Sequence, residues 1–160
     1  MSMCHTIDGV IMDIQNKIDI VRKNGHEVWV SGGVSLDAIE TLEDKMGIQL
    51  PILLKEFLLE FGALGIYDCF LSGISELDPL SLSGGNIYAD TCFLREDYPN
   101  LGENLWVLQL NEDGAYCLDT AEKSSNGEFA IVSFESGNSK VVYNSFPEFL
   151  TGYFKPWIES

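Results

Sequence analysis

The chain has 160 residues, 46% of them hydrophobic and 21% charged, and its 25 acidic against 9 basic residues give a net charge of −16. This length and apolar content predict a single folded domain over residues 1–160 and exclude a disordered chain. The acid excess argues against direct binding of nucleic acid or anionic membranes, because both need clusters of Lys and Arg. It favours a partner with a basic surface, although acidity also keeps many proteins soluble.

The acidic residues are concentrated in the middle of the chain. Between Lys55 and Lys123 the only basic residue is Arg95, and residues 56–122 hold 13 acids and this single base. Their net charge of −12 is three quarters of the total, on fewer than half of the residues. This base-poor stretch is therefore the predicted location of an acidic surface.

The cysteines and the apolar segments indicate where the protein resides. The four cysteines stand far apart without a C-x-x-C pair, which fits buried free thiols better than a disulfide framework or a zinc site. Residues 1–17 have neither the basic start nor the continuous apolar stretch of a signal peptide, and no segment has transmembrane length. We therefore expect a cytoplasmic protein.

The first third of the chain is predicted to be mainly helical, since apolar residues recur there at helical spacing. Ser35 is a candidate N-cap and Gly47 a stop for one helix, while Pro51 suits the first turn of the next. The expected elements are a helix over 10–21, an extended segment over 26–30, and helices over 36–46 and 51–61.

The rest of the chain is predicted to consist mainly of strands. Residues 112–114 form a hairpin signal between two of them, and Ser145 is the candidate N-cap of a last helix. The expected elements are an extended segment over 66–71, a loop over 72–85, a helix over 86–98, and strands over 105–110, 115–118, 129–134 and 140–143. Helices at both ends with adjacent strands between them indicate an α+β fold.

No residue pattern typical of an enzyme stands out. The two histidines, His5 and His26, lie beside no nucleophile motif. The glycine pairs at 32–33 and 84–85 lack the flanking residues of a phosphate-binding loop and are predicted to be turns. We expect no enzyme activity.

The carboxylates leave one catalytic alternative open. Acids in the helix predicted over 86–98 and in the hairpin at 112–114 could build a carboxylate-dependent hydrolase or a divalent-metal site, but no calcium-loop spacing is present. A solvated acidic face is the favoured interpretation, with neither metal nor cofactor. Three tryptophans are predicted to lie in the core or at its edge, namely Trp29, Trp106 and Trp157.

A first block of the sequence follows a recognisable pattern. It contains an I-x-x-L-E helix over Ile39–Glu43, a G-x-x-L-P break over Gly47–Pro51, and a helix that ends in Phe61-Gly62. The pattern often has a double glycine where this chain has Gly62-Ala63, and the loop over 72–85 does not align with it.

A second block contains Ala115–Thr120, Gly127-Glu128, a Val-Ser-Phe-Glu strand, and a helix start at Ser145. In this order, over about residues 33–150, the sequence resembles the SUKH superfamily. The resemblance is to its bacterial immunity proteins, which are related to the yeast cell-wall assembly regulator Smi/Knr.

This resemblance implies an α+β fold with a central, mostly antiparallel sheet flanked by N-terminal and C-terminal helices. It also implies a non-catalytic immunity protein, or antitoxin, that binds a cognate toxin, often a nuclease, and blocks its basic substrate site. The matched acids are Glu40 or Glu43 and Asp119, and the other matched positions mostly serve the scaffold. The alternative function is that of an intracellular scaffold or regulatory adaptor.

The partner-binding surface is predicted from charge density, since the family motifs do not locate it. An acidic inhibitor is attracted by the field of a basic toxin cleft. The candidate residues are carboxylates of the base-poor stretch: Asp68, Glu76, Asp78, Asp90, Asp97, Glu112, Asp113 and Asp119. The sequence leaves the oligomeric state open.

Overall fold

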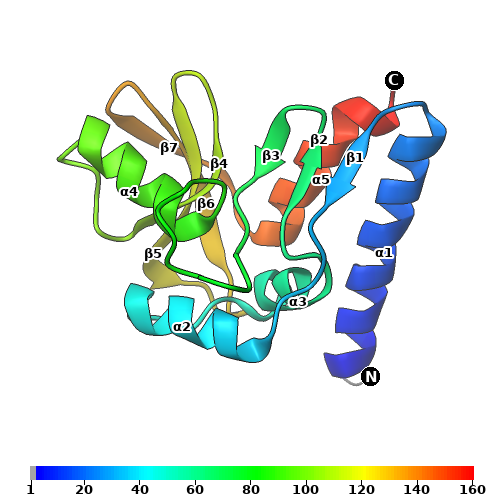
Figure 1. Ribbon diagram of the computed structural model, residues 1–160, viewed down its shortest axis with the longest axis horizontal. Coiled ribbons are helices and arrows are strands. Elements are labelled where there is room, and N and C mark those ends of the chain that lie inside the picture. Colours follow the sequence, from blue (N-terminus) through cyan, green and yellow to red (C-terminus); the bar gives the residue numbers. More distant parts are fainter. Residues whose placement is uncertain (1–2) are drawn as a thin grey trace.

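The computed structural model describes the backbone of residues 3–160 and the side chains of residue 9 and residues 11–160. Five helices and seven strands follow one another along this part of the chain and confirm the α+β class (Figure 1). In chain order they are α1 (Met3–Lys23), β1 (Val28–Val30), α2 (Leu36–Met46), α3 (Ile52–Phe61), β2 (Leu64–Ile66), β3 (Cys69–Leu71), α4 (Ile87–Asp97), β4 (Leu105–Leu110), β5 (Gly114–Lys123), β6 (Phe129–Glu135), β7 (Asn138–Tyr143) and α5 (Phe146–Ile158). None of the described helices is long and apolar enough to cross a membrane.

The ends of α2, α3, α4 and α5 lie close to where the sequence predicts them, because capping depends on local residues, whereas α1 begins seven residues before its predicted start. The Ser35 side chain accepts a hydrogen bond from the Ala38 amide at 3.2 Å, and Gly47 ends α2 with a φ of +75°. Ser145 caps α5 in the same way, through the Glu148 amide at 3.3 Å. These caps satisfy backbone N–H groups that have no partner within the helix.

The strands form two antiparallel sheets, whereas the resemblance implies one central sheet. One sheet has the order β1-β2-β3 and the other the order β4-β5-β6-β7. The segment predicted as one extended piece over 66–71 contains a turn at Tyr67-Asp68, so its residues belong to two strands. The sheets adjoin, since the Ser72 amide after β3 donates to the Leu108 carbonyl of β4 at 2.6 Å.

Two apolar cores support these sheets. The larger one gathers residues of α1, α3 and α5 with the inner face of the three-stranded sheet, and its aromatic centre includes Phe57 and Phe146 with ring centroids 5.4 Å apart. The smaller one lies between α4 and the four-stranded sheet, around Leu94, Val107 and Phe134. Burial of this much apolar surface provides the main stabilisation of the fold.

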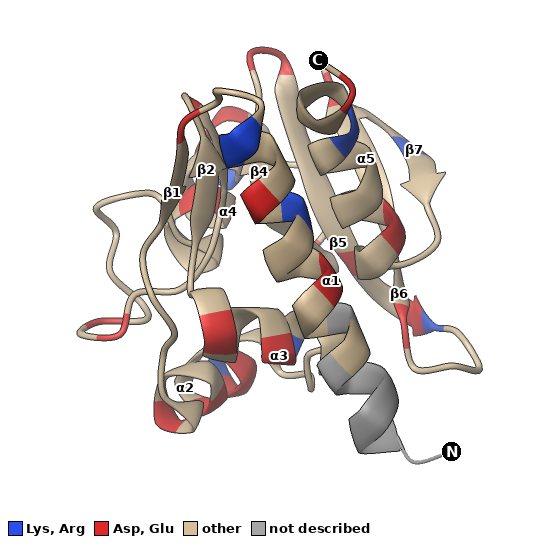
Figure 2. Ribbon diagram, turned by 90° about the vertical axis from the view of Figure 1, so that its right-hand side faces the viewer, with Lys and Arg blue, Asp and Glu red and all other residues tan. Residues whose placement is uncertain are grey.

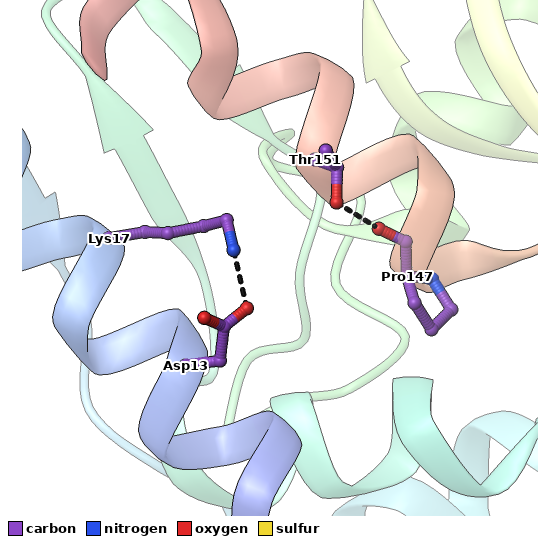
Figure 3. A network of polar contacts seen from close by, with 4 residues as sticks. All are labelled: Asp13, Lys17, Pro147 and Thr151. Carbon is purple, nitrogen blue, oxygen red and sulfur yellow. Dashed lines mark hydrogen bonds and ion pairs between the residues drawn. The ribbon is translucent and has the colours of Figure 1, made fainter.

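Helices α1 and α5 come from opposite ends of the chain and lie side by side (Figures 1 and 3). The polar contacts drawn in Figure 3 stay within each helix: Lys17 pairs with Asp13, and the Thr151 hydroxyl donates to the Pro147 carbonyl at 3.1 Å. Ile18 of α1 is fully buried in the same core as the aromatic residues of α5. This contact therefore combines apolar packing with hydrogen bonds from the Asn24 side chain, just after α1, to the last carbonyls of α5.

Candidate functional site

The outer face of the three-stranded sheet carries exposed aromatic side chains. Trp29 on β1 pairs with Gly65 on β2, and Gly65 pairs with Phe70 on β3, so the three residues form one row across the sheet, here called the aromatic row. Trp29 and Phe70 are each 48% exposed, and their rings meet edge to face with centroids 5.8 Å apart. Exposed aromatic side chains in contact with one another are typical of an interaction surface.

The residues beside the aromatic row point the other way, into the core. Val28, Leu64, Ile66 and Leu71 are all buried, as expected from the alternation of side chains along a strand. The prediction that Trp29 lies in the core or at its edge is wrong, because residue 29 takes the outward position of β1 between two inward-facing valines.

Gly65 allows the two rings to meet. The Phe70 ring lies so close above β2 that a Cβ atom on residue 65 would be 2.3 Å from Phe70 Cδ1. A side chain at this position would therefore displace the ring, and the ring in turn helps to bury the glycine. The glycine of the middle strand thus positions Phe70 against Trp29.

The turn between β2 and β3 holds a third exposed aromatic residue, Tyr67. Its φ of +53° lies in the left-handed region, which costs roughly 1–3 kcal/mol for a residue other than glycine. The Tyr67 amide donates to the Glu27 carbonyl at 3.1 Å, and its ring packs against Trp157 with centroids 5.5 Å apart. His26 Nδ1 lies 3.2 Å from the Tyr67 hydroxyl. These contacts hold Tyr67 in its left-handed conformation. Residues other than glycine with such a conformation occur often at functional sites.

Two hollows share the Phe70 side chain as a wall. The first, of about 440 Å³, is lined by Glu27, Trp29, Tyr67 and Phe70. The second, of about 250 Å³, extends from Phe70 toward Asp68 and Leu110. Among the described residues that line the two hollows there are carboxylates but neither Lys nor Arg. The surface is therefore aromatic at its centre and acidic at its border.

The acids predicted as a partner surface do not gather in one place. Six of the eight are exposed: Asp68, Glu76, Asp78, Asp97, Glu112 and Asp113. Asp68 lies in the β2–β3 turn beside the aromatic row, and the last two lie in the β4–β5 hairpin. Glu76 accepts a hydrogen bond from the Ser35 amide at 2.8 Å, at the start of α2. Figure 1 places α2 and the β2–β3 turn at opposite ends of the view.

The remaining two predicted acids have structural roles. The Asp90 carboxylate is 5% exposed and accepts hydrogen bonds from the Ser72 hydroxyl at 2.6 Å and the Gly85 amide at 3.1 Å. The half-buried Asp119 carboxylate accepts from the Asn104 side chain at 2.6 Å and from the backbone amide two residues later at 3.0 Å. The placement of Asp90 on a partner surface is thereby corrected, because burial and internal hydrogen bonds occupy its oxygens.

Two buried glutamates in the blocks of sequence resemblance also connect elements. Glu43 accepts a hydrogen bond from the Leu50 amide at 2.7 Å and lies 3.2 Å from Lys55 Nζ, so it ties the end of α2 to α3. Glu128 accepts from the first amide of α5 at 3.1 Å, and burial raises the pKa of its carboxyl. Of the two acids matched in the first block, Glu43 is buried and Glu40 is exposed.

The described residues contain no group of three His, Cys, Asp or Glu side chains that could hold a metal ion. Burial raises the pKa of the Cys117 thiol to about 12 and also raises the pKa of Cys69, so both thiols are poor nucleophiles at neutral pH. The aromatic row with its bordering carboxylates is an arrangement suited to contact with another molecule.

Sequence reasoning alone does not select Trp29 or Phe70 as site residues. A signal exists in the local pattern, since each is the middle residue of a three-residue strand with apolar neighbours. That pattern does not reveal which face of the sheet the helices cover. Of the other tryptophans, Trp106 is buried and Trp157 half-buried, as predicted.

A family model matches nearly the whole chain. It is that of SUKH_5, described as SMI1-KNR4 cell-wall, and it covers residues 8–155. This range includes both sheets, the aromatic row, and the two buried glutamates that connect α2 with α3 and β6 with α5.

Proposed function

Because this chain belongs to the SMI1-KNR4 family of the SUKH superfamily, we propose that it is an immunity protein that binds and neutralises a bacterial toxin domain. The superfamily is known for immunity proteins, and its SMI1-KNR4 members are generally non-catalytic. The family match is the observation that carries this proposal. Nucleases are the first class of toxin to consider, because they present a basic substrate site.

The charge of the chain supports a toxin with a basic surface. Residues 56–122 carry a net charge of −12, and six of the eight predicted carboxylates are exposed. Figure 2 shows Asp and Glu on α2 and α3, whereas α1 carries Lys and Arg beside its acids. A field of this sign attracts a basic protein and raises its association rate roughly 10- to 1000-fold at low salt.

Neutralisation follows when the protein occupies the substrate site of the toxin. A nuclease attracts its substrate with a basic cleft, and an acidic protein seated in that cleft excludes nucleic acid. Affinity requires a desolvated apolar centre as well, because exposed charge pairs contribute little. The aromatic row, bordered by Glu27 and Asp68, offers such a centre.

The proposal is tested with the products of the genes that neighbour the gene for this chain, among which we expect a toxin module. The purified protein should bind the module and abolish its activity at a one-to-one ratio. Full activity of the module in the presence of excess protein would refute the proposal.

Charge reversal tests the role of the acidic surface in the same assay. Replacing Glu112 and Asp113 by Lys should slow association and flatten its dependence on salt concentration, because steering acts on the association rate. The matched control replaces Glu40 and Asp44, two exposed acids of α2, by Lys and so changes the net charge equally. Equal association rates for the two variants would refute the prediction that Glu112 and Asp113 belong to the partner surface.

A further inference from the structure

We propose that the aromatic row and the carboxylates of Glu27 and Asp68 bind an arginine side chain at the centre of the toxin interface. This inference rests on the proposed function, since it names the chemical group of the partner that the surface receives. The group required is a planar cation, which stacks on aromatic rings and pairs with carboxylates.

The two rings of the aromatic row form an exposed corner. Trp29 and Phe70 meet at an interplanar angle of 78°, and about half of each side chain remains in contact with solvent. A cation within about 6 Å of a ring centroid is attracted by the negative face of the ring. The hollow of about 440 Å³ beside this corner is open to such a group.

Two carboxylates supply negative charge beside the rings. Glu27 lines the same hollow as Trp29 and Phe70, and Asp68 lines the neighbouring hollow that shares Phe70. Both acids are exposed, and neither belongs to the ion pairs found among the described residues, Lys17–Asp13 and Lys55–Glu43. Since no Lys or Arg of the described chain lines either hollow, a cationic group of a partner would find both carboxylates without an ion-pair partner.

The chemistry of this surface favours arginine over lysine. The guanidinium group is planar, more weakly hydrated than an ammonium group, and able to bond a carboxylate while it stacks on an aromatic ring. A lysine ammonium group is a point charge with a stronger hydration shell, which it would lose in contact with Trp29 and Phe70.

A second copy of this chain fits the surface poorly. Each copy carries a net charge of −16, and a two-fold contact would bring Glu27 and Asp68 of one copy close to the same acids of the other. Like charges across a desolvated contact oppose association. The apolar surface is therefore better matched to a basic protein than to itself.

A short arginine peptide tests this inference without the toxin. The full chain, with its tryptophans labelled by nitrogen-15, is titrated with acetylated tri-arginine amide and separately with the tri-lysine peptide. We expect the indole N–H signal of Trp29 to shift, with tighter binding of the arginine peptide. Phe70→Ala should weaken that binding roughly three- to tenfold. Glu27→Gln combined with Asp68→Asn should weaken it by a similar factor.

Two matched variants serve as controls. Val141→Ala removes an exposed apolar side chain from β7 of the other sheet, and Asp44→Asn removes an exposed acid from α2; both should leave peptide binding unchanged. Circular dichroism establishes that each variant is folded, and Phe70→Leu carries the test where Phe70→Ala does not fold.

Several results would overturn the inference. One is a dissociation constant for tri-arginine that is unchanged in both the Phe70 variant and the Glu27/Asp68 double variant. Another is a dimer of the wild-type chain in sedimentation that Phe70→Ala dissociates, since the row would then contact a second copy. If the toxin is inhibited although these variants bind it as tightly as wild type, the inference fails and the proposed function stands. If tri-arginine shifts Trp29 but the toxin is not bound, the proposed function fails.

Discussion

Replacement of Glu43 by Ala removes a buried carboxylate that contacts both the Leu50 amide and the Lys55 ammonium group. The Leu50 amide, buried at the break between α2 and α3, loses its hydrogen bond, which costs about 1–3 kcal/mol. Lys55 also loses the ion-pair partner of its ammonium group. Because the Lys55 side chain is 23% exposed, loss of this ion pair costs about 1 kcal/mol or less. The two contributions sum to about 1–4 kcal/mol, and we expect a loss in free energy of unfolding of about 2.5 kcal/mol.

Urea unfolding followed by circular dichroism measures this loss as a free energy, and thermal unfolding measures it as a shift in Tm. For a chain of this length, about 1 kcal/mol lowers Tm by about 2–4 °C, so Glu43→Ala should unfold at a temperature about 5–10 °C below that of wild type. Glu43→Gln should be intermediate, because its amide oxygen still accepts from Leu50. Glu40→Ala, an exposed acid one turn earlier in α2, is the matched control and should change stability by about 0.5 kcal/mol or less. Equal losses for Glu43→Ala and Glu40→Ala would refute the structural role of Glu43.

Three further predictions concern other buried groups. Burial raises the pKa of Glu128 in the folded state, so its contribution to stability is present below the unfolded pKa and is lost as the pH rises through the folded pKa. Glu128→Gln should therefore gain stability relative to wild type as the pH rises from 4.5 to neutrality, and a difference independent of pH in urea titrations would contradict this. The Cys117 thiol should resist iodoacetamide at mildly alkaline pH until urea is added, as mass spectrometry of its peptide would show, because burial raises its pKa to about 12. Tyr153→Phe should lose about 1–3 kcal/mol in urea unfolding, since its hydroxyl accepts from the Ile66 amide at 3.2 Å and donates to the Cys69 carbonyl; an unchanged midpoint would show that these bonds contribute nothing.

Helix ends that carry a capping residue could be predicted closely because these signals are local, whereas the start of α1 could not. Ser35, Gly47 and Ser145 act within one turn of their own position, so the residue type is enough to place a helix end. The β4–β5 hairpin follows in the same way from residues 112–114. The division of 66–71 into two strands escapes prediction, because Tyr67 adopts a positive φ without being a glycine.

The negative charge of the candidate site could be predicted from the sequence, but its position in the fold could not. Charge counting leads to an acidic stretch, yet Asp90 within it is buried and bonded to Ser72, a partner 18 residues away. Trp29 and Phe70 lie 41 residues apart and meet only because both pair with Gly65. Such a contact depends on strand register, which single-sequence patterns do not supply for strands of three residues. The aromatic centre of the surface therefore emerges only from the structure.

Survival of cells that express the toxin module expected among the neighbouring genes tests the central claim most directly. Co-expression of the wild-type chain should restore growth to the level of cells with an inactivated toxin, and the chain should be recovered bound to the module. The variant with Lys at positions 112 and 113 should protect less well than the variant with Lys at 40 and 44. Growth arrest that persists at a full level of folded wild-type protein would contradict the assignment of this SUKH chain as an immunity protein.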